Sequence, residues 1–227
     1  MLADTLSETL QHLENAAKAA HRPTPALLAV SKLQPASAVA ELARAGQRAF
    51  GENYVQEAQA KIGELAGMDL EWHLIGHLQS NKAELAAHLF DWVQTVDRHK
   101  LIGALSRYRP ADRAPLNVLV QVNIDDEASK HGCRPDEVAG LAEAIAAEPR
   151  LRLRGLMAIP APHPDTARRI DAFRRMQALQ DQLAAKHPGV DTLSMGMSDD
   201  YALAVAHGAT MVRIGTALFG ARPARTA

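Results

Sequence analysis

The chain of 227 residues contains almost no cysteine. Cys133 stands alone, so no intramolecular disulfide can form, and we expect a protein of the reducing cytoplasm. The preceding residues, Lys130-His131-Gly132, offer the thiol no fixed partner. We therefore expect Cys133 to be an inert thiol rather than a nucleophile.

An excess of either charge is also absent. Lys and Arg total 25 against 26 for Asp and Glu, a net charge of −1, which favours neither nucleic acid nor a membrane surface as a partner. The first eight residues are acidic early and form no continuous apolar core, so they do not resemble a signal peptide. No apolar run approaches the roughly 20 residues of a membrane span.

What the sequence does contain is a regular alternation of short apolar runs and helical periods. The expected strands are 27–32, 48–51, 71–76, 91–96, 116–123, 153–158, 192–195 and 211–214. The expected helices are 5–20, 35–46, 54–65, 81–89, 98–108, 135–147, 166–186 and 200–207. Asp199 and Asp200 are expected to cap the last of these helices.

Eight such βα units predict an α/β protein with a single (β/α)8 TIM barrel. Residues 1–21 would add an N-terminal helix, and the barrel would run from about 27 to 220, with 1–227 as one domain. A doubly wound open sheet is the alternative, but such sheets usually have fewer strands.

Barrel active sites form where strands end at their carboxyl side. Seven residues are expected there: Lys32, Asn53, His77, Asn123, Met157, Ser194 and Arg213. Strand 8 closes against strand 1, so Arg213 should enter the barrel mouth beside Lys32. Two neighbouring cations require an anion between them or a lysine that loses its proton, and such a lysine can form a Schiff base. The alternative is that both cations pair with exposed acids on the rim.

Glycine-rich loops follow the last two strands. Ser194-Met195-Gly196-Met197-Ser198 and Gly215-Thr216 occupy the loops where barrels commonly hold a phosphate. Beside a Schiff-base lysine they indicate an aldehyde that carries a phosphate, and pyridoxal 5′-phosphate is the leading candidate. An arginine near its pyridine nitrogen would disfavour protonation there and weaken the ring as an electron sink.

A metal site is not expected. His73 and His77 have the i, i+4 spacing of a helical metal site, but they lie on a strand and its exit, roughly 13 Å apart at the rise of a strand.

From about residue 27 to the end, the sequence resembles the YggS/PROSC family of pyridoxal phosphate homeostasis proteins. The segments that carry the resemblance are 29–32 (AVSK), 50–57 (FGENYVQE), 72–82 (WHLIGHLQSNK), 155–160 (GLMAIP), 194–200 (SMGMSDD) and 212–220 (VRIGTALFG). It implies a barrel like the N-terminal domain of alanine racemase.

For the site, the resemblance implies pyridoxal phosphate bound covalently to Lys32 as an aldimine, with its phosphate at Ser198, Gly215 and Thr216. Arg213 would face the pyridine nitrogen, and Asn53 would lie near the cofactor. With the rim and loop residues, the expected cofactor-binding set is Lys32, Asn53, Met157, Ser194, Gly196, Met197, Ser198, Arg213, Gly215 and Thr216.

Three functions remain open at this point. The favoured one is a cytoplasmic protein, a monomer or weak dimer, that binds and buffers pyridoxal phosphate or delivers it to apo-enzymes without turnover. The second is an amino-acid racemase that uses Lys32 as one base; it needs a second base, and nothing in the sequence positions Tyr54 or Tyr201 for that task. The third is a Schiff-base enzyme acting on another phosphorylated aldehyde or sugar.

Overall fold

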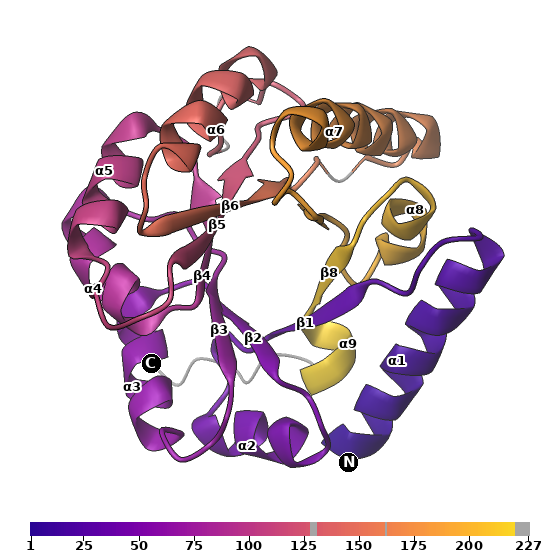
Figure 1. Ribbon diagram of the computed structural model, residues 1–227. Helices are drawn as coiled ribbons and strands as arrows, with labels where there is room; N and C mark the ends of the chain where they lie inside the picture. The colour runs from indigo at the N-terminus through magenta and orange to yellow at the C-terminus, as the bar shows by residue number, and fades with distance from the viewer. Residues whose placement is uncertain (128–130, 162, 221–227) are drawn as a thin grey trace.

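Eight parallel strands form a closed barrel in chain order, as the sequence predicts (Figure 1). The computed structural model describes residues 1–127, 131–161 and 163–220, so residues 221–227 of the expected single domain lie outside the described part. The strands are β1 (Ala26–Val30), β2 (Ala49–Glu52), β3 (Glu71–Leu74), β4 (Trp92–Val96), β5 (Leu116–Gln121), β6 (Leu151–Met157), β7 (Thr192–Ser194) and β8 (Met211–Ile214).

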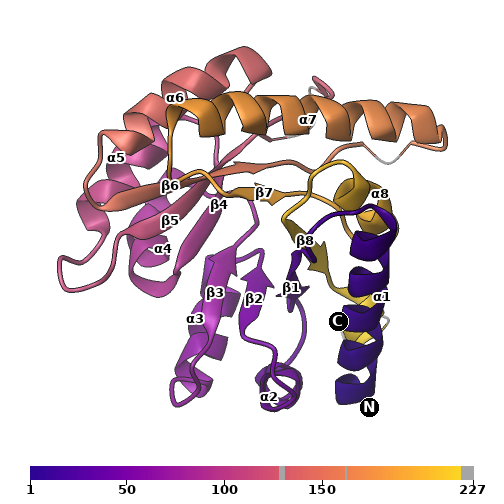
Figure 2. The same ribbon diagram turned by 45° about the vertical axis from the view of Figure 1, so that its right-hand side comes forward.

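Helices cover the outside of the barrel (Figures 1 and 2). They are α1 (Leu2–Ala19), α2 (Ala36–Arg44), α3 (Val55–Glu64), α4 (Ala83–Leu89), α5 (His99–Tyr108), α6 (Val138–Ala146), α7 (Thr166–Lys186), α8 (Tyr201–Ala206) and α9 (Thr216–Phe219). Two 3-10 turns, η1 (Ser80–Lys82) and η2 (Pro135–Glu137), lead into α4 and α6. In the described part of the chain, no helix is long and apolar enough to cross a membrane.

The N-terminal helix α1 is the expected addition to the barrel. Its buried face presents Leu6, Leu13 and Ala17, and it packs against α2, α8 and α9. Figure 1 shows it outside the β8–β1 seam, where α9, the last helix among the described residues, has only four residues. The helix therefore shields β8, which carries Arg213, and β1, which precedes Lys32, from solvent on the outer side.

Most of the apolar core lies between the barrel and its helices, while the interior of the barrel is mixed. Leu28, Ile75 and Met211 form one small interior cluster, and Trp92, Leu119 and Met157 form another. The register pairs Leu28 with Arg213, which puts the arginine on the inner face above Met211. This confirms the orientation of strand 8 that the sequence predicts.

Several strands end earlier than the sequence indicates. β1 ends at Val30 because Ser31 begins a turn, in which the amide of Gln34 donates to the Ser31 carbonyl at 3.0 Å. β3 and β5 likewise end two residues short of the expected limits, at Leu74 and Gln121. Lys32 therefore leaves the strand before it reaches the rim, and a turn sets its direction.

Candidate functional site

A groove of about 270 Å³ opens at the carboxyl end of the barrel, beside β1 and β8. Its lining residues are Val30, Lys32, Asn53, Ile75, Ile159, Met197, Ser198, Asp199, Arg213, Gly215 and Thr216. Seven of the ten expected cofactor residues are among them, and Met157, Ser194 and Gly196 are not. The ends of β1 and β8 and the loop after β7 thus meet at one site, as barrel closure requires.

The other three expected residues lie beneath or behind this groove. Met157 is fully buried in the barrel interior against Trp92 and Leu119. Ser194 is fully buried and accepts a hydrogen bond from Arg213. Gly196 has φ +93°, and a Cβ there would come within 2.6 Å of Ala204, so the loop can turn tightly only with glycine. These three residues support the lining rather than form it.

The residues on both sides of Lys32 are hydrogen-bonded to two glutamates, one at the end of β2 and one on α3. The Ser31 hydroxyl donates to Glu52 Oε1 at 2.6 Å, and the Leu33 amide donates to Glu57 Oε1 at 2.5 Å. Leu33 has φ +62°, a left-handed conformation that a leucine adopts only at a cost. The turn that carries Lys32 is therefore fixed by its neighbours.

Lys61 bonds to both of these glutamates and to Ser31, and the sequence analysis missed it. We call these hydrogen bonds around the Ser31–Leu33 turn the brace. The Lys61 ammonium donates to the Ser31 carbonyl, to Glu52 and to Glu57 at 2.6–2.8 Å, while its side chain is only 7% exposed. Burial raises the pKa of Glu52, although the bonds from Lys61 and Ser31 oppose that shift. The i, i+4 spacing of Glu57 and Lys61 on α3 is the sequence signal that could have revealed the pair.

Arg213 lies at the floor of the groove and pairs with neutral groups. It donates to Ser194 Oγ and to the Ala158 carbonyl, both at 2.8 Å. Burial lowers the pKa of Arg213 to about 10, and the negative charge of Asp200 opposes the shift. Both of these hydrogen-bond partners are thus neutral groups, and the guanidinium is a positive charge held at the base of the groove.

A line of hydrogen bonds connects Arg213 to the opposite end of the barrel. Ser194 Oγ donates to Gln94 Oε1 at 2.7 Å, and the amide nitrogen of Gln94 donates to His73 Nδ1 at 2.9 Å. Since Nδ1 accepts, the proton of His73 is on Nε2, which donates to Glu71 at 2.8 Å. Burial lowers the pKa of His73, which keeps the imidazole neutral in this role.

The loop after β7 is held by an acid that the sequence analysis assigned elsewhere. Asp200 occupies the N-cap position of α8, but its side chain makes no capping hydrogen bond. Instead Asp200 Oδ1 accepts from the Met197 amide at 2.7 Å, inside the glycine loop. Asp200 therefore holds the N-cap position that the sequence predicts, but its carboxylate bonds the loop amide of Met197 and not a helix amide.

Two features favour a ligand in the groove. Asn53 Oδ1 is buried without a hydrogen-bond partner, which is costly unless something else supplies a donor. A Cβ on Gly215 would lie 3.2 Å from the Val30 carbonyl, a tight contact, so glycine lets the start of the loop after β8 pass close to the end of β1. Together with the amine of Lys32 and the charge of Arg213, these features fit a small phosphorylated aldehyde.

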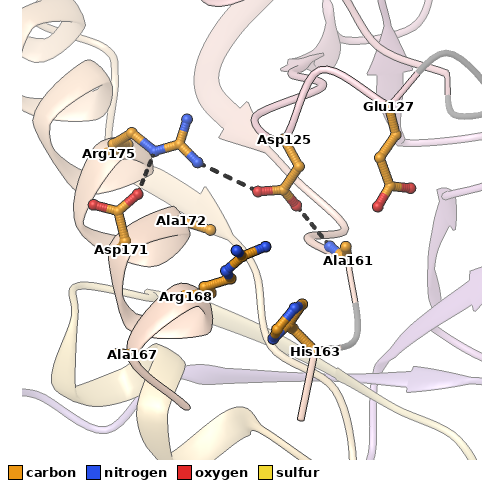
Figure 3. Close-up of a pocket in the computed structure, with 9 residues that line it drawn as sticks. All are labelled: Asp125, Glu127, Ala161, His163, Ala167, Arg168, Asp171, Ala172 and Arg175. Atoms are coloured by element: carbon orange, nitrogen blue, oxygen red, sulfur yellow. Dashed lines mark hydrogen bonds and ion pairs between the residues drawn. The ribbon is translucent and has the colours of Figure 1, made fainter. Parts of the chain in front are cut away.

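A larger cavity of about 550 Å³ lies elsewhere, between the β5 and β6 loops and the start of α7 (Figure 3). Its charges are largely satisfied by one another. Arg175 bonds Asp125 at 3.3 Å and Asp171 at 2.9 Å, and Asp125 also accepts from the Ala161 amide. None of the described residues that line this cavity is a lysine, whereas the groove beside β1 and β8 contains Lys32, the amine that a Schiff base needs.

Two other candidates from the sequence have definite places. His73 is buried inside the barrel and bonded on both ring nitrogens, so it does not join His77 in a site. Cys133 is buried, and burial raises the pKa of its thiol to about 12. It is therefore present as the thiol and lacks nucleophilic character, as the sequence predicts.

The fold and the site together define a class of protein. Residues 5–223 match the family model described as "Alanine racemase, N-terminal domain". The chain belongs to this family and, within it, to the group of pyridoxal phosphate homeostasis proteins, two members of which are more than 50% identical to it.

The Escherichia coli (strain K12) pyridoxal phosphate homeostasis protein is 56% identical over 199 residues, which cover 86% of this chain and 85% of that protein. The Pseudomonas aeruginosa protein of the same name is 52% identical over 223 residues, 97% of this chain and 96% of that one. The solved structure of PipY from Synechococcus elongatus PCC7942 with pyridoxal phosphate bound superposes with a TM-score of 0.85 at 37% identity and covers 97% of this chain and 100% of its own.

Alanine racemases share the fold alone. The Corynebacterium glutamicum enzyme has a TM-score of 0.69 at 21% identity, and the match covers 99% of this chain but 63% of the enzyme. The comparison therefore supports the barrel that the resemblance implies and carries no argument for racemisation.

Proposed function

We propose that this chain binds pyridoxal 5′-phosphate in the Lys32 groove and takes part in keeping the intracellular pool of that cofactor in balance. The observation that carries the proposal is the meeting of Lys32, Arg213 and the Ser198 and Gly215–Thr216 loops in one groove. The names of the close relatives and the cofactor bound to PipY support it.

Each part of the groove has a task in this proposal. Pyridoxal phosphate supplies an aldehyde that a lysine amine can hold covalently, and Lys32 is the lysine in the groove. Ser198, Gly215 and Thr216 bind the phosphate through hydroxyl and amide donors. Arg213 would lie near the ring nitrogen and disfavour its protonation, because a proton there would sit beside a second positive charge.

The position of Arg213 near the ring nitrogen favours storage of the cofactor over catalytic turnover. A ring nitrogen without a proton withdraws little electron density, so the bound cofactor stabilises carbanions poorly. The braced turn of Ser31 and Leu33 holds Lys32 in place and favours retention of the cofactor. Racemisation would need a second base, and Tyr54, the tyrosine next to Asn53 in the chain, is 59% exposed.

The setting of this function is part of the same proposal. The chain acts in the cytoplasm as one domain, a monomer or weak dimer, and passes pyridoxal phosphate to apo-enzymes that require it. The near-zero net charge supports small-molecule exchange rather than attachment to nucleic acid or membrane.

The proposal is tested by adding pyridoxal phosphate to the full chain and recording its visible absorption after dialysis. Wild type and the control Lys100→Ala, an exposed lysine on α5, should retain a bound-cofactor band, and Lys32→Ala should lose it. Absence of the band in wild type would reject the proposal. Incubation of the loaded protein with L-amino acids in deuterium oxide then separates storage from racemisation, since sustained exchange at Cα would establish turnover.

A further inference from the structure

Three residues that the cofactor groove does not use converge on the same rim of the barrel. His77, Asp97 and His131 each offer one ligand atom, and these atoms lie within 4.8 Å of one another. They follow β3, β4 and β5, which are neighbours in the barrel. We propose that His77, Asp97 and His131 form a binding site for a divalent first-row transition metal of the Zn²⁺ type.

The exit of β3 places His77. The Thr95 hydroxyl, on β4, donates to the Gly76 carbonyl at 2.9 Å, which ties the residue before His77 to the next strand. A Cβ on Gly76 would lie 2.0 Å from the Asn53 carbonyl, so the chain can pass here only with glycine. The backbone at His77 is therefore held from both neighbouring strands, and its side chain is 31% exposed at the rim.

Arg98 orients the carboxylate of Asp97. Its guanidinium donates to Asp97 Oδ1 at 2.5 Å and to the Leu78 carbonyl at 2.8 Å. The second carboxylate oxygen, Oδ2, lies 4.0 Å from His77 Nδ1, which is too far for a hydrogen bond. One oxygen is thus used for positioning and the other faces the imidazole, an arrangement common for carboxylates that bind metals.

The third ligand comes from a segment that folds back on β5. Gly132 has φ +120°, and a Cβ there would come within 2.6 Å of the Asn123 amide nitrogen, so glycine is required for this close approach. Cys133 then exchanges backbone hydrogen bonds with Gln121 and Asn123 at 2.9 Å. The Gln121 side chain donates to the His131 carbonyl at 3.2 Å, which fixes the backbone of the ligand itself.

Both imidazoles are free to act as ligands. Their rings stack with centroids 3.6 Å apart, and within the described residues neither ring makes a hydrogen bond. The two nitrogens and Asp97 Oδ2 thus form a set of lone pairs that the protein does not otherwise use.

The donor set selects the ion. Two imidazoles and one carboxylate suit Zn²⁺ and its neighbours, whereas Ca²⁺ and Mg²⁺ require oxygen ligands. Ligand atoms on a tetrahedral Zn²⁺ lie about 3.4 Å apart, so the two exposed imidazoles must turn out of their stacked arrangement to direct both nitrogens at one ion. Three protein ligands leave a position for water, next to a cavity lined by Asn53, Gln121 and Asn123.

This site departs from the sequence expectation of no metal. That expectation concerned His73 and His77, which the strand holds apart, and it could not consider Asp97 or His131, whose approach depends on the barrel. None of its three ligands lines the Lys32 groove, so metal binding is tested separately from cofactor binding, although Asn53 lines both cavities.

The test is a calorimetric titration of the metal-free full chain with ZnCl₂. Wild type should bind one Zn²⁺ per chain, and His77→Gln, His131→Gln and Asp97→Asn should each weaken binding at least ten-fold. His12→Gln, which removes an exposed histidine on α1, should bind as wild type does. Circular dichroism spectra that match wild type would show that the variants are folded.

A second measurement uses the wild-type protein alone, so it does not depend on whether the variants fold. Co²⁺ added to wild type should give the visible absorption of a four-coordinate histidine site, and Zn²⁺ should displace it. The proposal is overturned if wild type binds no Zn²⁺, or if His77→Gln and His131→Gln bind it as tightly as His12→Gln does. Lys32→Ala should retain full Zn²⁺ affinity, so failure of the cofactor proposal leaves this test unaffected.

Discussion

Arg213 donates a hydrogen bond to the hydroxyl of Ser194 at 2.8 Å, and both side chains are buried. The bond joins the floor of the Lys32 groove to a chain of hydrogen-bonded side chains that continues through Gln94 and His73 to Glu71. Neutral groups therefore hold the Arg213 side chain in place. Each of these groups also determines which atom donates in the next hydrogen bond of the line.

Removing the Ser194 hydroxyl should weaken the fold. Ser194→Ala leaves a buried guanidinium N–H and the Gln94 carbonyl oxygen without their partner, which should lower the free energy of unfolding by about 1–3 kcal/mol. Urea denaturation measures this change. Ser37→Ala, an exposed serine on α2, should change stability by less than about 0.5 kcal/mol. Equal stability of the two variants would show that the bond to Arg213 contributes nothing.

The buried His73 should make stability depend on pH. Burial lowers its pKa below the ordinary 6.5, so below that pH the unfolded chain binds a proton that the folded chain does not. The free energy of unfolding should therefore fall as pH decreases through and below 6.5, at up to about 1.4 kcal/mol per pH unit for this proton.

Urea denaturation at a series of pH values across 6.5 measures that slope. His73→Gln should flatten the profile, and the exposed His12→Gln should keep the wild-type slope. Some slope will remain in His73→Gln, because burial also lowers the pKa of His77 and His207. Identical profiles for wild type and His73→Gln would contradict this account.

Lys61 should matter both for stability and for cofactor capture. Lys61→Met leaves Glu52 and Glu57 without their shared cation, and breaking such a buried pair costs about 3–5 kcal/mol. The turn of Ser31 and Leu33 then loosens, so the variant should also hold pyridoxal phosphate less tightly. Urea denaturation and a cofactor titration measure the two effects, with the exposed Lys100→Met as the matched control. A Lys61→Met protein as stable as this control would refute the proposed brace.

Gly76→Ala should disturb the groove through Asn53. The new Cβ would lie 2.0 Å from the Asn53 carbonyl, so the backbone at Asn53 must shift. We expect cofactor affinity to fall by about ten-fold or more, which corresponds to about 1.4 kcal/mol. Gly103→Ala is the matched control, because nothing lies within 4 Å of a Cβ at that helical position. Unchanged cofactor affinity in Gly76→Ala would show that Asn53 does not contribute to cofactor binding.

The barrel was accessible from the sequence because its strands and helices follow local patterns, and seven of the ten residues expected at the site line the groove. Alternating apolar runs indicate the eight strands, and barrel closure then brings Arg213 to β1. The brace around Lys32 was missed because Glu52 and Lys61 meet only after α3 packs on the strands. The convergence of His77 and His131 was equally hidden, since a fold-back segment more than fifty residues downstream brings the second ring. The side chain of Asp200 was misassigned because a loop amide and a helix amide compete for the same carboxylate.

The central claim is that Lys32 holds pyridoxal phosphate covalently. Borohydride reduction of the loaded full chain, followed by proteolysis and mass spectrometry, fixes the cofactor on the lysine that bears it. The account predicts a pyridoxyl group on the peptide that contains Lys32, in wild type and in Lys100→Ala alike. A label confined to any other lysine, or no label after loading, would contradict it.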